Sequence, residues 1–249
     1  MKKSRVRVLL IGAAGRMGKT IVDFASRAPN IEIVAQCDLG DAIEPAMKNC
    51  DVAIDFSHAD AIEQICRAAL LATASPSSGG QDRPALGGLV IGTTGHSPAQ
   101  QELIKKTAQS VPIVFASNFS IGVNALFALT HNAAEILSDE FGIEIIETHH
   151  RMKKDAPSGT AKTLAEILKK ARKIDKEIPT RSIREGDVVG EHTVVFTGPG
   201  ERVELTHRAS SREIFARGAL RAAQWVIGKR AGLYTMRDVL GLRICSGAL

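Results

Sequence analysis

The sequence predicts an α/β protein in which a mostly parallel sheet with covering helices is followed by a second, α+β region. Three observations lead to this prediction. In the first half, short runs of Val, Leu and Ile alternate with helical patterns. The first run is followed at once by a glycine-rich turn and a helix. After residue 118 the alternation gives way to strands with a hairpin signature.

Composition excludes several classes of protein. The 249 residues are 44% hydrophobic and 24% charged, as in an ordinary globular protein. No apolar run approaches the roughly 18 residues of a membrane span, and Met1–Arg5 leads straight into a strand pattern with no sign of a secretory signal. The cysteines, at positions 37, 50, 66 and 245, are scattered. We therefore expect a cytoplasmic protein with reduced thiols and no membrane partner.

The net charge of +5 and the pI near 9.1 raise the question of nucleic-acid binding. Aromatic residues make up only 4%, however, and single-stranded nucleic acid is bound largely through aromatic faces. Basic residues also form no long run. We expect no nucleic-acid partner, and a mild positive excess that attracts small anions instead.

The elements of the first half follow in order. Five strands are expected at Arg5–Ile11, Ile31–Cys37, Asp51–Phe56, Leu89–Ile91 and Pro112–Ala116. The first is continuous in Val, Leu and Ile, as in a strand buried on both faces. Helices are expected after the glycine-rich turn, where apolar residues recur at three- and four-residue steps, and at Ala59–Leu71 and Pro98–Gln109. The segment Ala74–Leu86 is rich in Ser, Gly and Pro, which predicts an exposed loop. We favour a neutral insertion over a lid for this loop.

The second half begins with an expected helix at Val123–Leu137 and a strand at Ile143–Glu147. Ala161–Ala171 has its apolar residues on one face and predicts an amphipathic helix. The strand patterns His192–Thr197 and Arg202–Thr206 flank a Gly-Pro-Gly-Glu turn and indicate a hairpin. Glu213–Ile227 then returns to a helical pattern.

The turn after the first strand reads Gly12-Ala13-Ala14-Gly15-Arg16-Met17-Gly18. Glycines there let backbone N–H groups approach a pyrophosphate, which the positive end of the helix dipole also attracts. Asp38 ends the second strand, where a carboxylate accepts hydrogen bonds from the adenosine ribose. The spacing is GxxGxxG, so a plain tight turn is the alternative. The pattern predicts a dinucleotide site that includes Gly12, Ala13, Ala14, Gly15, Arg16, Met17 and Asp38.

Asp38 also bears on the choice between NADH and NADPH. Its carboxylate repels the 2′-phosphate of NADPH, and the next residue is Leu39, not a basic one. Arg16 is placed to offer the missing positive charge. We therefore expect NADH to be used at least as well as NADPH.

Two more turns follow predicted strands. Gly92-Thr93-Thr94-Gly95 comes after the fourth strand, and Ala116-Ser117-Asn118-Phe119-Ser120 comes after the fifth. Open α/β sheets bind ligands at the carboxyl ends of their strands. Each turn alone is ordinary, but together they favour a cofactor cleft lined by Gly92, Thr93, Thr94, Ala116, Ser117, Asn118 and Phe119.

The segment Glu147–Ala161 concentrates reactive residues: His149, His150, Lys153 and a Ser158-Gly159-Thr160 turn that opens a helix. Histidine exchanges protons near neutrality, and a helix start with hydroxyls suits a carboxylate or phosphate. Either histidine alone is more simply explained as a structural residue at the end of a strand than as a functional one. The whole cluster, downstream of a dinucleotide fold, favours function. The adjacent histidines have no Cys or carboxylate at ligand spacing, so we expect no metal.

With these residues the sequence resembles the 4-hydroxy-tetrahydrodipicolinate reductase (dihydrodipicolinate reductase) family of lysine and diaminopimelate biosynthesis. The shared motifs run nearly end to end: GAAGRMG at 12–18, DFS at 55–57, GTTG at 92–95, ASNFSIGVN at 116–124, ETHHRMKKDAPSGTA at 147–161 and SSREIFARGAL at 210–220. The segment with the two histidines is the most specific of these motifs.

The resemblance implies a homotetrameric NAD(P)H-dependent oxidoreductase that reduces 4-hydroxy-tetrahydrodipicolinate, a cyclic dicarboxylate, to tetrahydrodipicolinate. It implies a Rossmann-like domain formed by residues 1–120 and 212–249, with an inserted α+β domain, 121–211, for substrate binding and tetramer formation. By position, His149 is the implied proton donor, and Lys153 its partner in catalysis and substrate binding. The other implied substrate ligands are His150, Ser158, Gly159, Thr160 and Arg212.

Two other classes of function remain alternatives. A non-catalytic nicotinamide-binding sensor needs the glycine turn and Asp38, but has no reason to keep His149, Lys153 and the Ser-Gly-Thr turn together. A different dehydrogenase for a small carboxylate would combine a cationic pocket with another proton relay.

Overall fold

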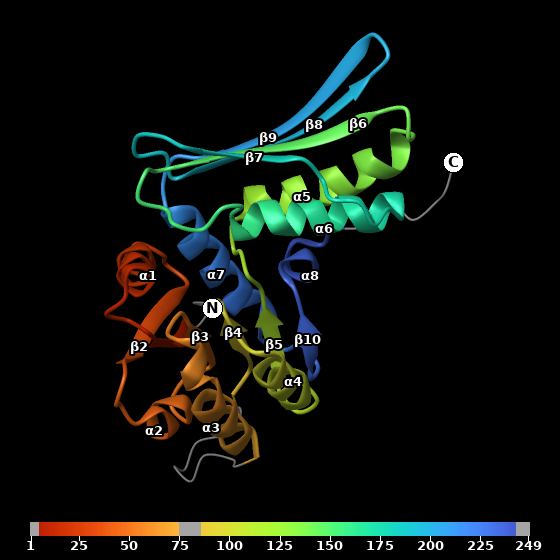
Figure 1. Cartoon of the computed structure of the whole chain (residues 1–249). Helices are drawn as coiled ribbons and strands as arrows, with labels where there is room; N and C mark the ends of the chain where they lie inside the picture. Colours follow the sequence, from red (N-terminus) through yellow and green to blue (C-terminus); the bar gives the residue numbers. More distant parts are fainter. Residues whose placement is uncertain (1–4, 75–85, 243–249) are drawn as a thin grey trace. The chain divides into compact units, whose positions relative to one another are not determined.

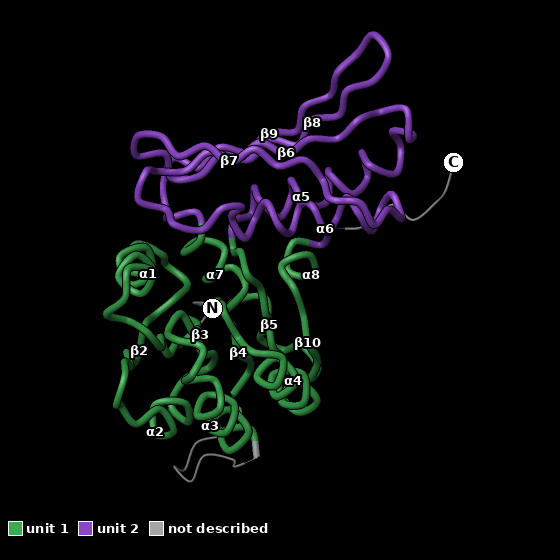
Figure 2. The backbone as a smooth tube through the Cα atoms, in the orientation of Figure 1, with its two compact units in different colours: residues 1–119, 215–240 green, residues 120–214, 241–249 purple. Residues whose placement is uncertain are grey.

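The structure is a computed structural model that describes residues 5–74 and 86–242 (Figure 1). Except for its two end residues, the predicted Ala74–Leu86 loop lies outside the described part of the chain. The described residues form two compact units (Figure 2): unit 1 runs up to Phe119 and takes in Phe215–Leu240, and unit 2 contains Ser120–Ile214. The functional division into residues 1–120 with 212–249, and 121–211, stays a prediction.

Unit 1 contains a six-stranded sheet in the order β10-β5-β4-β3-β1-β2, and all neighbouring strands are parallel. Its strands are β1 Val6–Ile11, β2 Ile31–Cys37, β3 Val52–Asp55, β4 Leu89–Ile91, β5 Pro112–Phe115 and β10 Gly232–Tyr234. The predicted Rossmann-like parallel sheet is confirmed. The strand β10 was not predicted, because three residues are too few to show a periodic pattern.

Helices cover both faces of this sheet, because successive side chains in a strand point to opposite sides. Leu9 of β1 packs in a core with α2 Ile43–Met47, α3 Ile62–Ala74 and α4 Pro98–Thr107. Leu10 packs in the opposite core with α1 Arg16–Ser26, α7 Glu213–Val226 and α8 Met236–Leu240. A 3₁₀ turn, Ala59–Ala61, precedes α3. The helices α2 and α8 were not predicted; each has only five residues.

Unit 2 contains a four-stranded mixed sheet in the order β7-β6-β8-β9. Its strands are β6 Gly142–His149, β7 Thr180–Arg184, β8 Gly190–Gly198 and β9 Glu201–Ala209. The strands β8 and β9 form the predicted hairpin, and only β6 and β7 pair in parallel. The strand β6 extends two residues beyond the prediction, so that His149 is its last residue.

Two helices, α5 Ile121–Ile136 and α6 Gly159–Arg172, cover one face of this second sheet (Figure 1). The apolar face of α6 packs Leu164 and Leu168 against Ile145 of β6 and Val194 of β8. The strand β7 was missed because its sequence, Thr-Arg-Ser-Ile-Arg, has one aliphatic residue. Among the described residues, no helix is long and apolar enough to cross a membrane.

Candidate active site

The predicted cofactor residues of unit 1 lie in loops at the carboxyl ends of four parallel strands. Gly12–Met17 follow β1 or begin α1, Asp38 follows β2, Gly92–Thr94 follow β4, and Ala116–Phe119 follow β5. Backbone hydrogen bonds join neighbouring loops and strands: Gly12 N donates to Cys37 O (2.8 Å), and Ala116 N donates to Ile91 O (3.2 Å). The loops therefore form one continuous edge of the sheet.

The glycine turn is packed so closely that two of its glycines leave no room for a side chain. Gly12 has φ of +83°, and a Cβ there would lie 2.5 Å from the carbonyl oxygen of Phe56. A Cβ on Gly18 would collide with the carbonyl oxygen of Gly12. Gly15 caps α1 without a side-chain hydrogen bond, and the first turn of α1 has no acidic residue. The first N–H groups of α1 are thus suited to a pyrophosphate.

Asp38 lies directly beside this turn. Its two carboxylate oxygens accept from the N–H of Ala14 at 3.0 and 3.1 Å, and the side chain of Leu39 is fully exposed. Phe119, in contrast, is 2% exposed and packs with its ring centroid 5.6 Å from that of Phe56. Its side chain belongs to the core, so any contact of Phe119 with a cofactor must come from its backbone.

The end of β3 also lies at this edge, although no residue there was predicted as a ligand. Asp55 is fully buried, and its Oδ1 accepts from Ser57 N at 2.9 Å. Burial raises the pKa of Asp55 against the lowering effect of its hydrogen bonds from Ser57. The DFS motif was the available signal, but the motif alone assigns it no role.

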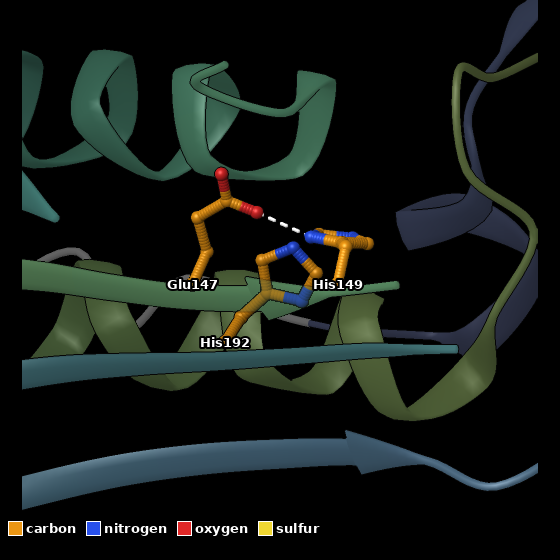
Figure 3. A group of neighbouring side chains, drawn as sticks. All are labelled: Glu147, His149 and His192. Atoms are coloured by element: carbon orange, nitrogen blue, oxygen red, sulfur yellow. Dashed lines mark ion pairs between the residues drawn. The ribbon is translucent and has the colours of Figure 1, made fainter. Parts of the chain in front are cut away.

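The histidine site of unit 2 is built across three strands. Glu147 and His149 are two residues apart on β6 and therefore point to the same side of the sheet. In the strand register, Glu147 lies opposite His192 of β8, and His149 lies opposite Arg184 of β7. Figure 3 shows the imidazole of His149 facing the carboxylate of Glu147, with the ring of His192 beside both.

These side chains form a buried network of charges. Glu147 is 0% exposed, and its two oxygens have different partners. Oε2 is in ion-pair contact with Nδ1 of His149, and Oε1 accepts from Nη2 of Arg184 at 2.8 Å. The rings of His149 and His192 meet edge to face at a centroid distance of 5.0 Å.

The network sets the protonation of its members. Burial alone would raise the pKa of Glu147, but hydrogen bonds from Arg184 and Ser182 hold it below its ordinary value. Burial lowers the pKa of His149, and Glu147 opposes this effect while Lys153 adds to it. Burial, aided by the charge of His149, lowers the pKa of His192 to about 4. His192 is therefore neutral near pH 7.

Two other predicted residues join this network. Ser158 caps α6 by accepting from Ala161 N at 3.3 Å, and its Oγ lies 3.2 Å from Nε2 of His192. Lys153 follows β6, and its Nζ donates to both carboxylate oxygens of Asp155 at 2.8 and 2.9 Å. Gly159 and Thr160 are the first residues of α6, the end of a helix to which the helix dipole attracts an anion.

The remaining predicted substrate ligands lie further from these contacts. His150 follows His149, and its backbone N–H donates to Val188 O at 2.7 Å. Arg212 lies half-buried in the short segment between β9 and α7. The described contacts that join His149, Ser158 and Lys153 do not include Arg212.

The expectation of no metal rested partly on the absence of a carboxylate at ligand spacing, and that reason is wrong. Glu147, His149 and His192 offer ligand atoms within 4.8 Å of one another. Two histidines and a carboxylate are a known zinc-binding set. Here, however, Glu147 already contacts His149 directly and binds the cation of Arg184, which would repel a metal ion. The absence of a metal stays a prediction.

Sequence reasoning missed His192, Arg184 and the role of Glu147. The i, i+2 spacing of Glu147 and His149 was a signal for a shared strand face. His192 stood at the start of a predicted strand, but the pairing partner of that strand was not known. Arg184 belongs to the unpredicted strand β7, so no local pattern pointed to it.

Comparison with known proteins decides the family. Residues 6–80 and 85–119 match the family described as dihydrodipicolinate reductase, N-terminus, and residues 122–240 match its C-terminus. The chain belongs to the dihydrodipicolinate reductase family. The predicted resemblance is therefore confirmed, and with it the nicotinamide cofactor and the oxidoreductase class.

Individual relatives of this reductase family agree. A 4-hydroxy-tetrahydrodipicolinate reductase of Akkermansia muciniphila is 48% identical, covering 95% of this chain and 98% of its own. One of Geobacter metallireducens is 37% identical, covering 96% and 100%. A dipicolinate-bound dihydrodipicolinate reductase from Paenisporosarcina sp. TG-14 has the same fold, with a TM-score of 0.76, 23% identity and coverage of 94% and 98%.

Proposed function

We propose that this chain reduces 4-hydroxy-tetrahydrodipicolinate to tetrahydrodipicolinate in lysine and diaminopimelate biosynthesis. The observation that supports this best is the buried Arg184–Glu147–His149 network beside the Ser158 cap of α6. It combines a proton donor with a binding site for anions, as reduction of a cyclic dicarboxylate requires. Family membership supplies the substrate class.

His149 supplies the proton in this proposal. Reduction of a conjugated cyclic imine leaves negative charge developing on the ring, and a positioned acid neutralises it. The carboxylate of Glu147 fixes the orientation of the imidazole and favours its protonated form. A bound dicarboxylate adds negative charge and so raises the pKa of His149 above its value in the free enzyme.

The start of α6 holds the substrate carboxylates. Ser158, Gly159 and Thr160 offer a hydroxyl and N–H groups, and the helix dipole favours an anion there. Lys153 adds a positive charge once it exchanges Asp155 for substrate, and His150 and Arg212 complete the proposed set. His149 and Lys153 are the proposed catalytic residues.

The glycine turn, Asp38 and the loops after β4 and β5 bind the nicotinamide dinucleotide. When bound, that cofactor supplies the hydride. We propose that NADH is used at least as well as NADPH, because the carboxylate of Asp38 borders the turn and the neighbouring Leu39 has no charge for a 2′-phosphate. A hundredfold preference for NADPH would contradict this part of the proposal.

We also propose that the enzyme is a cytoplasmic homotetramer formed through unit 2. In the described part of unit 2, α5 and α6 cover only one face of the four-stranded sheet, which leaves the other face for association. Cys37, Cys50 and Cys66 are free and buried, as suits a reducing compartment. Light scattering of the purified protein measures the assembly directly.

The deciding experiment follows NADH absorbance with purified enzyme and freshly made cyclic imine. We expect oxidation that is proportional to enzyme and that stops when the imine is omitted. Binding of NADH without turnover would indicate a sensor. Oxidation with another small carboxylate, but not with the imine, would indicate a different dehydrogenase.

A further inference from the structure

Arg184 makes contacts that no catalytic or binding role explains so far. Its side chain is 18% exposed and lies beside His149 in the sheet. Nη2 donates both to Glu147 Oε1 at 2.8 Å and to the carbonyl oxygen of Asp155 at 2.6 Å, and Nε donates to the carbonyl oxygen of Lys153 at 3.3 Å. One guanidinium group thus joins the strand that carries the proton donor to the segment that carries the lysine.

We propose that Arg184 is a positioning residue: it fixes Glu147, which orients His149, and at the same time fastens the backbone that carries Lys153. The inference rests on the proposed function, because His149 and Lys153 are the groups that it positions. Arg184 itself need not touch the substrate.

The first half of this role follows from burial. Glu147 has no access to water, so its charge needs partners inside the protein. Arg184 supplies a permanent positive charge to one oxygen and leaves the other oxygen for His149. Without Arg184 the carboxylate would keep its charge beside the imidazole but would lose the partner that fixes its orientation.

The second half follows from the shape of the guanidinium group. Only a planar fork with several N–H donors reaches Glu147, Lys153 and Asp155 together. A lysine in its place would keep a charge near Glu147 but would leave the two carbonyl oxygens without this donor. The Lys153 segment would then be free to shift, and substrate binding would suffer more than proton donation.

The charges around His149 provide a readout that a merely structural role would not give. The groups that face it are Glu147 on β6, Lys153 after β6, Arg184 on β7 and His192 on β8. Glu147 raises the pKa of His149, whereas Arg184 lowers it. Removing each charge should therefore move the alkaline limb of kcat/KM, where His149 loses its proton, in opposite directions.

The test compares Arg184→Met, Arg184→Lys and Glu147→Gln with the control Arg67→Met, which removes an exposed Arg–Glu pair from unit 1. Activity is measured with NADH and the cyclic imine across pH. We expect Arg184→Met to lower kcat/KM by about 10²-fold, as a displacement of about 1 Å does, and to move its alkaline limb to higher pH. Glu147→Gln should move that limb to lower pH. Arg184→Lys should raise KM more than it lowers kcat, and Arg67→Met should match wild type.

Different results would overturn the positioning role of Arg184 and the proposed function. If wild type fails to turn over the imine, the proposed function is wrong. If wild type is active and His149→Gln is not, but Arg184→Lys equals Arg67→Met in both kcat and KM, the positioning role is wrong. The positioning role is also wrong if the alkaline limbs of kcat/KM in Arg184→Met and Glu147→Gln move in the same direction while both variants keep the native circular dichroism spectrum. Should Arg184→Met not fold, Arg184→Lys and Glu147→Gln decide the matter.

Discussion

The loop edge of the sheet in unit 1, which we propose binds the dinucleotide, and the histidine site of unit 2 are built in different ways. The edge is made mainly of backbone, in glycine turns and helix N–H groups, with one side-chain carboxylate at the surface. The histidine site is made of side chains that are buried together and neutralise one another. Adding a Cβ should therefore impair the loop edge of unit 1, whereas removing a charge or a ring should impair the histidine site of unit 2.

The largest effect is expected for His149→Gln, which removes the proton donor and keeps the size of the side chain. We expect kcat to fall by about 10²–10⁴-fold, the usual contribution of a general acid, while NADH binding stays unchanged. Steady-state kinetics and a fluorescence titration of NADH measure the two quantities. His131→Gln, on α5 of the same unit, is the control. Wild-type turnover in His149→Gln would remove the residue from the mechanism.

The next largest effect is expected for Gly12→Ala. The new Cβ meets Phe56 O, and φ of +83° costs a non-glycine residue roughly 1–3 kcal/mol, so the Kd for NADH should rise by about 10–100-fold. Because the proton donor is intact, kcat at saturating NADH should stay near that of wild type. Gly142→Ala is a matched control, since its Cβ would lie an ordinary 3.8 Å from Thr197 O. An unchanged Kd would show that the turn does not hold the cofactor.

A third prediction concerns stability at acid pH. The pKa of His192 is about 4 in the folded protein and 6.5 when unperturbed, so the unfolded chain binds more protons between these values. Stability should fall as pH drops from 6.5 towards 4, by roughly 2–3 kcal/mol for this residue alone. Urea unfolding at pH 7 and pH 4.5 tests this: His192→Asn should lose less stability than wild type. His58→Asn, at an exposed side chain, should not differ from wild type.

The smallest effect is a shift between two pH profiles. Burial and Lys153 hold the pKa of His149 below 6.5 in the free enzyme, so kcat/KM should fall as pH rises through that lowered value. The dicarboxylate raises the pKa of His149 in the complex, so the alkaline limb of kcat should lie at higher pH. Rates from pH 5 to 9 give both limbs. Coincident limbs would mean that the substrate charge does not reach His149.

The same contrast explains how much could be predicted from the sequence. The parallel sheet, the glycine turn and Asp38 are contiguous or periodic, and the structure has the strands and turn where the pattern predicts them. The short elements α2, β10 and α8 were missed because three to five residues show no period. For Phe119, the sequence could not distinguish a loop residue from a core side chain.

The histidine site could be predicted only in part. His149, Lys153 and Ser158 lie within one segment, and a segment is visible in a sequence. Arg184 and His192 reach the site through strand pairing, which depends on register across β7, β6 and β8. The pairing of β6 with β7 is parallel, through a connection that contains all of α6, so no short-range pattern reveals it.

We propose that backbone in unit 1 binds the dinucleotide while side chains in unit 2 donate the proton. The double variant Gly12→Ala/His149→Gln tests it most directly, through kcat/KM for NADH relative to wild type and both single variants. Independent sites give effects that add as free energies, so the loss in the double variant should equal the product of the two single losses. A double variant no worse than His149→Gln alone would contradict the claim, because the two residues would then be serving one and the same step.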